Sequence, residues 1–157
     1  MARSEATLST ELQALPKTLG SGSAALALAY KNYMNGATAL TPIEQAATPV
    51  AATAMAAAMT FAAGATPAAG ATIIANGLIA FWAAMNIPAS SFFLNATVVT
   101  PPAGLSTIIA GLTSVLTDNA DTELTSAEAC DALAAVIHAA SNGGTATTPT
   151  AVVTPIL

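Results

Sequence analysis

The stretch TPVAATAMAAAMTFAAGATPAAGATIIANGLIAFWAAM, residues 48–85, decides which folds this chain can adopt. It contains no charged residue, and the charge-free interval extends over the 73 residues from 45 to 117. In its second half the larger apolar side chains recur at the spacing of one helical face. They are Ile74, Leu78, Phe81, Trp82 and Met85. The stretch predicts two helices, over about 49–63 and 70–86, separated near Gly64.

The composition of the whole chain is equally unusual. The 157 residues are 54% hydrophobic, largely alanine, and only 7% are charged, against about 25% in an ordinary soluble domain. A chain of this length is most simply one domain. Alanine adds little buried area but lets helices approach closely. The composition therefore predicts a thin core with small residues at the helix contacts.

Further apolar patterns predict helices over 5–15, 24–34, 104–117 and 125–140. Three Thr-Pro pairs read as helix starts, because threonine caps a helix and proline fits its first position; their prolines are Pro42, Pro49 and Pro67. Residues 90–99 read as extended because they carry β-branched and aromatic residues ahead of Thr-Pro-Pro. The tail 145–157 reads as extended because it is rich in β-branched residues and in proline. The expected fold is mainly α: a small helical bundle at 1–144, with an extended or β segment near 90–100, and an extended C-terminal arm at 145–157.

The outer faces of the central helices consist of Ala, Ser, Thr and Gly, where a surface helix normally carries charge. Small residues are typical of close helix contacts. We therefore expect these faces to be covered, either by other protein subunits or by lipid. Residues 70–88 approach the length of a membrane-spanning helix, so an integral membrane protein is the alternative. Asn76 and Asn86 within this span, and the lack of flanking Lys or Arg, argue against it.

The negative net charge of the chain limits the kinds of partner that it can bind. The net charge is −5, with three cations, Arg3, Lys17 and Lys31. Because phosphate binding depends on Lys and Arg, we expect no direct nucleic-acid binding and no attraction to an anionic membrane surface. The first 17 residues lack the apolar region of a secretory signal, so export by that route is not expected. A single cysteine, Cys130, rules out an internal disulfide.

The sequence contains few residues that could take part in catalysis or bind a metal ion. His138 is the only histidine, and Asp131 lies two turns away on its predicted helix, about 10 Å, too far for a hydrogen bond. One His and one Cys build neither a zinc site nor a Cys–His nucleophile. The acidic run 118–131 lacks the alternating ligands and the glycine of a calcium loop. We expect no catalytic, cofactor-binding or metal-ligating residue; a small enzyme or ligand-binding module is a distant third possibility.

Three segments carry a resemblance to a known class of proteins: LIAFWAAM followed by an extended run into VVTPP, the helix LSTIIAGLTSVL, and ACDALAAVIHAASNGGTAT. In style and order they resemble the small, alanine-rich structural proteins of tailed bacteriophages, over roughly residues 70–150. The resemblance implies a non-enzymatic virion component of the tail, neck or baseplate. It also implies several copies, assembled in the bacterial host cytoplasm, in contact with copies of itself and with other virion subunits.

The C-terminal arm offers a specific contact. Its apolar residues Val152, Val153, Ile156 and Leu157 suit a strand added to the sheet edge of another subunit better than a free linker. We therefore expect the arm to tether the chain to a neighbour.

Overall fold

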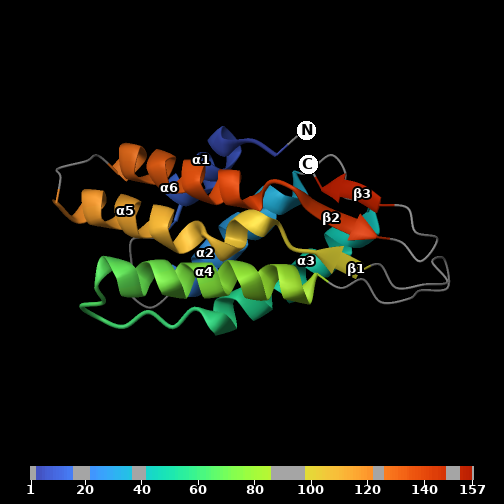
Figure 1. Cartoon of the computed structure of the whole chain (residues 1–157), viewed down its shortest axis with the longest axis horizontal. Coiled ribbons are helices and arrows are strands. Elements are labelled where there is room, and N and C mark those ends of the chain that lie inside the picture. Colours follow the sequence, from blue (N-terminus) through green and yellow to red (C-terminus); the bar gives the residue numbers. More distant parts are fainter. Residues whose placement is uncertain are drawn as a thin grey trace.

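Helices make up most of the chain in the computed structural model (Figure 1), which describes residues 3–15, 22–36, 42–85, 98–121, 126–147 and 153–156. The mainly α fold with a small β component is thus confirmed. The elements are α1 (Glu5–Gln13), α2 (Gly22–Asn35), α3 (Pro42–Ala58), α4 (Pro67–Ala84), β1 (Val98–Thr100), a 3₁₀ turn (Ala103–Ser106), α5 (Ile108–Asp121), α6 (Ser126–Ser141), β2 (Gly144–Thr147) and β3 (Val153–Ile156).

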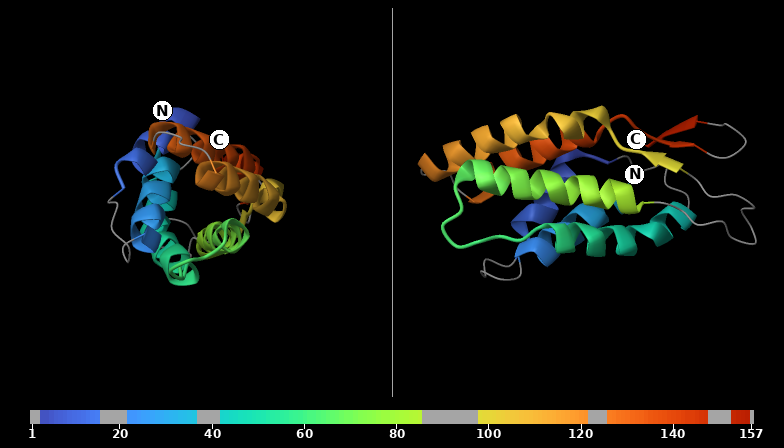
Figure 2. Two further views of the ribbon diagram at one scale, coloured as in Figure 1. Left: turned by 90° about the vertical axis from the view of Figure 1, so that its left-hand side faces the viewer. Right: turned by 60° about the horizontal axis from the view of Figure 1, so that its bottom comes forward.

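The helices are arranged as a closed ring. Each helix packs against the ones before and after it in sequence, and α6 returns to pack against α1. The end-on view in Figure 2 shows this circuit. Large side chains from opposite sides of the ring fill its centre, and the bulkiest are fully buried: Trp82, Tyr30, Tyr33, Phe81, Met34, Met55 and Met85. Tyr30 and Phe81 meet edge to face, with ring centroids 4.9 Å apart, a favourable aromatic geometry.

A three-stranded antiparallel sheet lies at one end of the ring (Figure 1), with strand order β1-β2-β3. Val99 pairs with Ala146, and Thr145 pairs with both Thr100 and Pro155. The described residues of the arm therefore form β3 and all of β2 except Gly144; these two strands pair with each other, and β2 also pairs with β1 of the same chain. Pro155 fits there because β3 is an edge strand, where a missing N–H is tolerated. The remainder of the predicted extended segment 90–99, up to 97, lies outside the described residues.

The prediction of a helix start at Pro49 is wrong, because α3 begins at Pro42 and continues through Pro49 to Ala58. Thr48, which was expected to cap a helix beginning at Pro49, makes a hydrogen bond to another helix instead. Thr48 is fully buried, and its hydroxyl donates to Asn35 Oδ1 on α2 at 2.8 Å. A tertiary hydrogen bond thus replaces the expected local cap, and α3 carries a proline in its interior.

The alanine-rich helix also ends earlier than predicted, at Ala58 rather than near Ala63. Residues 59–66 form an irregular connection in which Met59 is buried and Phe61 is 44% exposed. Met59 packs on Gly77 of α4 so closely that a Cβ at Gly77 would lie 2.5 Å from Met59 Cγ. The position of Met59 is therefore determined by its packing against α4 and not by the periodicity of a helix.

The remaining boundaries differ from the predictions by a few residues. Helix α4 begins at Pro67, three residues early, where the Thr66 hydroxyl accepts from the Ala69 N–H, so the Thr-Pro signal at this site is confirmed. The predicted helix 104–117 splits at Thr107 into the 3₁₀ turn and α5, and α5 continues to Asp121. Helix α6 matches its predicted range closely. The predicted first residue of this helix, at position 125, lies outside the described residues.

Candidate functional site

A buried arginine joins the start of the chain to α2 and α6. Arg3 is 6% exposed, and its Nη1 donates to Met34 Sδ at 3.2 Å and to the Ser141 carbonyl at 3.3 Å. The guanidinium carbon lies 5.6 Å from the centre of the Tyr33 ring, a cation–π distance. Sequence reasoning counted Arg3 only as one of three cations. No local pattern marks it, because its partners come from 31 to 138 residues away.

A second polar cluster connects three helices inside the core. The Tyr30 hydroxyl accepts from Trp82 Nε1 at 2.9 Å and lies 2.8 Å from Ser141 Oγ. Burial raises the pKa of Tyr30, although the hydrogen bonds from Ser141 and Trp82 oppose this. The hydroxyl therefore stays neutral. Because the cluster is fully buried, it acts as internal support and not as a site for a ligand.

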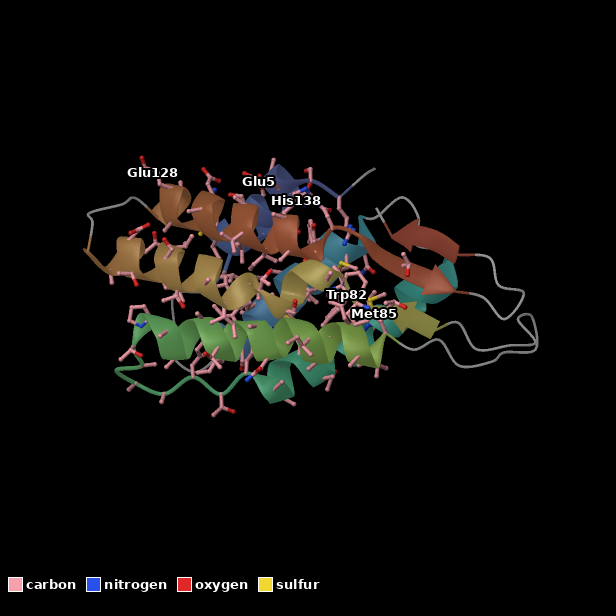
Figure 3. All side chains as sticks on the ribbon, in the orientation of Figure 1. Glu5, Trp82, Met85, Glu128 and His138 are labelled. Carbon is pink, nitrogen blue, oxygen red and sulfur yellow. The ribbon has the colours of Figure 1, made fainter. Side chains whose placement is uncertain are left out.

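His138 belongs to the same region. Its Nδ1 lies 2.7 Å from the Tyr33 hydroxyl, and the two rings are nearly perpendicular. Burial raises the pKa of Tyr33, so its hydroxyl stays neutral in this hydrogen bond. His138 does lie in the last turn of α6, as predicted, but its hydrogen bond is to α2. Figure 3 shows it on α6, toward the opposite end of the helix from Glu128.

The other candidate residues do not assemble into a reactive site. Asp131 accepts a short hydrogen bond from the Ser9 hydroxyl of α1, so its contact is between helices. Cys130 is partly buried. Among the residues that the structure describes, no three His, Cys, Asp or Glu side chains gather to hold a metal ion. The geometry brings His138, Tyr33 and Arg3 together, and it separates this group from Cys130 and Asp131.

An apolar groove of about 800 Å³ opens between α1, α2, α6 and the connection that follows α3. Its larger lining residues are Leu12, Leu15, Leu26, Met59, Phe61 and Leu133, and Cys130 lies among them. Its described lining residues include no charged side chain. Among these residues there is no convergent set of polar groups of the kind that orients a small substrate.

Another surface feature is a face without charge. The exposed residues of α3, α4 and α5 between 48 and 117 are Ala, Ser, Thr, Pro, Asn and a few larger aliphatics. The charged residues of the described ranges, apart from buried Arg3, lie outside this interval: on α1 (Glu5, Glu11), α2 (Lys31), the first turn of α3 (Glu44), the end of α5 (Asp118, Asp121) and α6 (Glu128, Asp131). Charge is therefore absent from α4 and from the greater part of α3 and α5. We call the exposed part of α3, α4 and α5 within 48–117 the uncharged face.

The arm residues proposed as a tether are only partly described. Val153 and Ile156 lie in β3, opposite Thr147 and Gly144 of β2. Val152 and Leu157 lie outside the described residues. Strand β3 is at the edge of the sheet, so none of the described strands pairs with its outer side. The tether stays a prediction.

Comparison with known proteins gives no match: no family model matches the chain, and no curated protein or solved structure is significantly similar to it.

Proposed function

We propose that the chain is a non-enzymatic structural subunit of a multi-subunit assembly, a tail, neck or baseplate component of a tailed-phage virion. Its partners are copies of itself and other virion subunits, and it works by packing against them. The polar groups inside the ring hold the protomer together, and the outer faces supply the contacts.

The observation that carries this proposal is the uncharged face. An exposed helix surface normally bears charge, and a soluble monomer gains solubility from it. Across the exposed residues of three adjacent helices, this surface instead presents small and mildly polar side chains. Such a surface allows another backbone to approach closely without desolvating charge. The phage-like order of segments over 70–150 supports the choice of a virion among possible assemblies.

Particle composition tests the proposal. Virions purified by density gradient from a host that produces this chain are analysed by quantitative mass spectrometry. We expect the chain in the particle fraction at several copies per particle, resistant to high-salt washing. A chain found only in the soluble lysate, and absent from intact particles, would contradict the virion assignment.

One observation favours the membrane alternative. Helix α4 is the one helix in the described segments that is long and apolar enough to cross a bilayer. Seven of its residues are buried against the rest of the ring, as in the core helix of a soluble protein, which passes the same test of length and composition. Extraction separates the two functions: a structural subunit is soluble without detergent, whereas a spanning α4 requires detergent.

A further inference from the structure

Polar side chains join α2 to α6 at one place in the ring. The Tyr33 hydroxyl of α2 lies 2.7 Å from Nδ1 of His138 on α6. Beside this pair, the Tyr30 hydroxyl lies 2.8 Å from Ser141 Oγ, and Arg3 donates to the Ser141 carbonyl. Helix α1 packs on both α2 and α6. Among these polar groups, the imidazole of His138 is the one that ordinarily takes up a proton near neutral pH.

The direction of the hydrogen bond between Tyr33 and His138 follows from the partners available. Burial raises the pKa of Tyr33, so the hydroxyl keeps its proton. Among the described groups, this hydroxyl has one hydrogen-bond partner, Nδ1 of His138. A neutral imidazole carries its proton on one nitrogen. When that nitrogen is Nε2, Nδ1 accepts from the hydroxyl and both groups are satisfied. The neutral ring with Nδ1 free to accept is therefore the form that fits the folded chain.

A second proton on the imidazole removes this arrangement. Nδ1 then carries hydrogen and cannot accept, so the hydroxyl proton of Tyr33, a fully buried residue, has no acceptor among the described groups. A buried donor without a partner destabilises the folded state by more than a typical hydrogen bond stabilises it. The new positive charge also lies beside the same tyrosine ring as Arg3. The centre of the Tyr33 ring is 5.9 Å from the centre of the His138 ring and 5.6 Å from the guanidinium carbon, and like charges oppose each other.

The other titratable groups around α6 decide how far this effect is opposed. Besides Arg3, they are Glu5 and Glu11 on α1, Tyr30, Lys31 and Tyr33 on α2, Asp118 and Asp121 on α5, and Glu128, Cys130 and Asp131 on α6 itself. Helices α1 and α6 run antiparallel, since Arg3 contacts the end of α6 and Ser9 contacts its first half. This puts Glu5 about level with His138. Glu5 is exposed and forms no ion pair with His138, so salt screens its attraction for the imidazolium.

We propose that the hydrogen bond between Tyr33 and His138 is a pH-sensitive latch, which holds α2, α6 and the N-terminal segment together and opens when His138 takes up a proton. The unfolded chain has no such hydrogen bond and takes up the proton more readily. The stabilising effect is therefore complete above about pH 6.5, the ordinary range of histidine, and is lost as the pH falls through it. Opening loosens Arg3 and α1, whereas α3 and α4 lie on the other side of the ring. The latch is a property of the single chain and does not depend on the proposed assembly.

Two substitutions in the full chain test the latch. His138→Gln keeps an acceptor for the Tyr33 hydroxyl but takes up no proton, and Tyr33→Phe removes the hydroxyl while keeping the ring. Glu5→Gln is the control for the neighbouring charge. The melting temperature is measured by circular dichroism from about pH 8 to about pH 5.5, above the range in which ordinary carboxylates titrate. If His138→Gln fails to fold, His138→Asn replaces it.

We expect the melting temperature of the wild type and of Glu5→Gln to fall by about 2–4 °C over this range, and that of both latch variants to fall by less than half as much. A wild-type profile parallel to that of His138→Gln overturns the latch. A Tyr33→Phe variant that keeps the wild-type dependence also overturns it, because the effect then belongs to the imidazole alone.

Amide hydrogen exchange locates the opening. Exchange is followed by mass spectrometry at both ends of the pH range and corrected for the intrinsic rate at each pH. We expect α1 of the wild type to exchange faster at the acidic end, and α3 to keep its protection. An equal change in α1 and α3 means that acid acts on the whole fold, which overturns a local latch.

Discussion

At Gly144 the backbone lies directly against the indole ring of Trp82. A Cβ at this position would come within 2.6 Å of two ring carbons, Cη2 and Cζ3. The ring cannot move aside easily, since Trp82 is fully buried and its N–H is bonded to Tyr30. We expect Gly144→Ala to destabilise the fold by about 1–3 kcal/mol, measured by urea unfolding with Trp82 fluorescence.

The matched control is Gly22→Ala. A Cβ there meets nothing within 4 Å, and Gly22 is the first residue of α2. Its alanine variant should be as stable as the wild type or slightly more stable. Equal stability of the two variants would contradict the close contact of β2 with Trp82.

The buried tyrosines make stability depend on alkaline pH. Burial raises the pKa of both Tyr30 and Tyr33 above the ordinary value of about 10. The folded chain thus keeps two phenol protons that the unfolded chain loses. The stabilising effect is complete below pH 10 and declines as the pH rises further. We expect the melting temperature to fall above pH 10, and to fall less steeply in the Tyr30→Phe, Tyr33→Phe variant. Parallel pH profiles for the two proteins would contradict this.

On the scale of elements, α3 makes a prediction at Pro49. Because α3 runs through this residue, the carbonyl of residue 45 lacks its usual N–H partner. A proline inside a helix destabilises the folded state by about 3 kcal/mol relative to alanine. Proline also restricts the unfolded chain, which offsets up to about 1 kcal/mol of this loss. Pro49→Ala should therefore stabilise the protein by about 2 kcal/mol, measured by thermal and urea unfolding.

Pro67 provides the comparison for this prediction. It occupies the start of α4, where proline is favoured, so Pro67→Ala should leave stability nearly unchanged or lower it slightly. If Pro49→Ala behaves like Pro67→Ala, then a helix starts at Pro49 after all, as the Thr-Pro pattern suggested.

The same two prolines show what sequence could establish about the elements. The presence of the helices and their buried faces could be predicted from the spacing of apolar residues, as at Ile74, Leu78 and Phe81, because this spacing is a local signal. The prediction of a helix start at Pro49 was wrong because the Thr48 hydroxyl donates to Asn35 on α2. This is a contact between helices, which no local sequence pattern reports. Met59 lies outside the predicted helix for the same kind of reason: because Gly77 has no side chain, Met59 can pack closely on α4.

For the whole molecule, composition predicted a bundle with small residues at its contacts, but not the closed ring. Closure depends on α1 meeting α6, through Arg3 with Ser141 and Ser9 with Asp131. These partners are more than 100 residues apart, and single polar residues carry no periodic signal. The uncharged face could be predicted from the charge-free interval, but its place on three helices that are neighbours in the ring could not.

The arm hypothesis predicts the effect of a truncation. Removing residues 145–157 deletes β3 and most of β2 but retains all six helices and the contact of Gly144 with Trp82. We expect unchanged helical content by circular dichroism, and loss of assembly by light scattering if the arm tethers neighbours. A truncated chain that assembles like the full chain would exclude the tether.

A disulfide distinguishes an arm that folds back from an arm that crosses to a neighbour. Thr145 and Pro155 are direct partners across β2 and β3, and opposed positions in an antiparallel pair lie within about 4.4–6.8 Å, the usual Cα spacing of a disulfide. In a Cys130→Ala background, Thr145→Cys with Pro155→Cys should oxidise to a bond within one chain. On a non-reducing gel the protein would then migrate as a single chain, while each single-cysteine control stays unbridged within its chain. A ladder of covalently linked chains would mean that β3 pairs with the β2 of another subunit, so the hairpin of the isolated chain opens when the assembly forms.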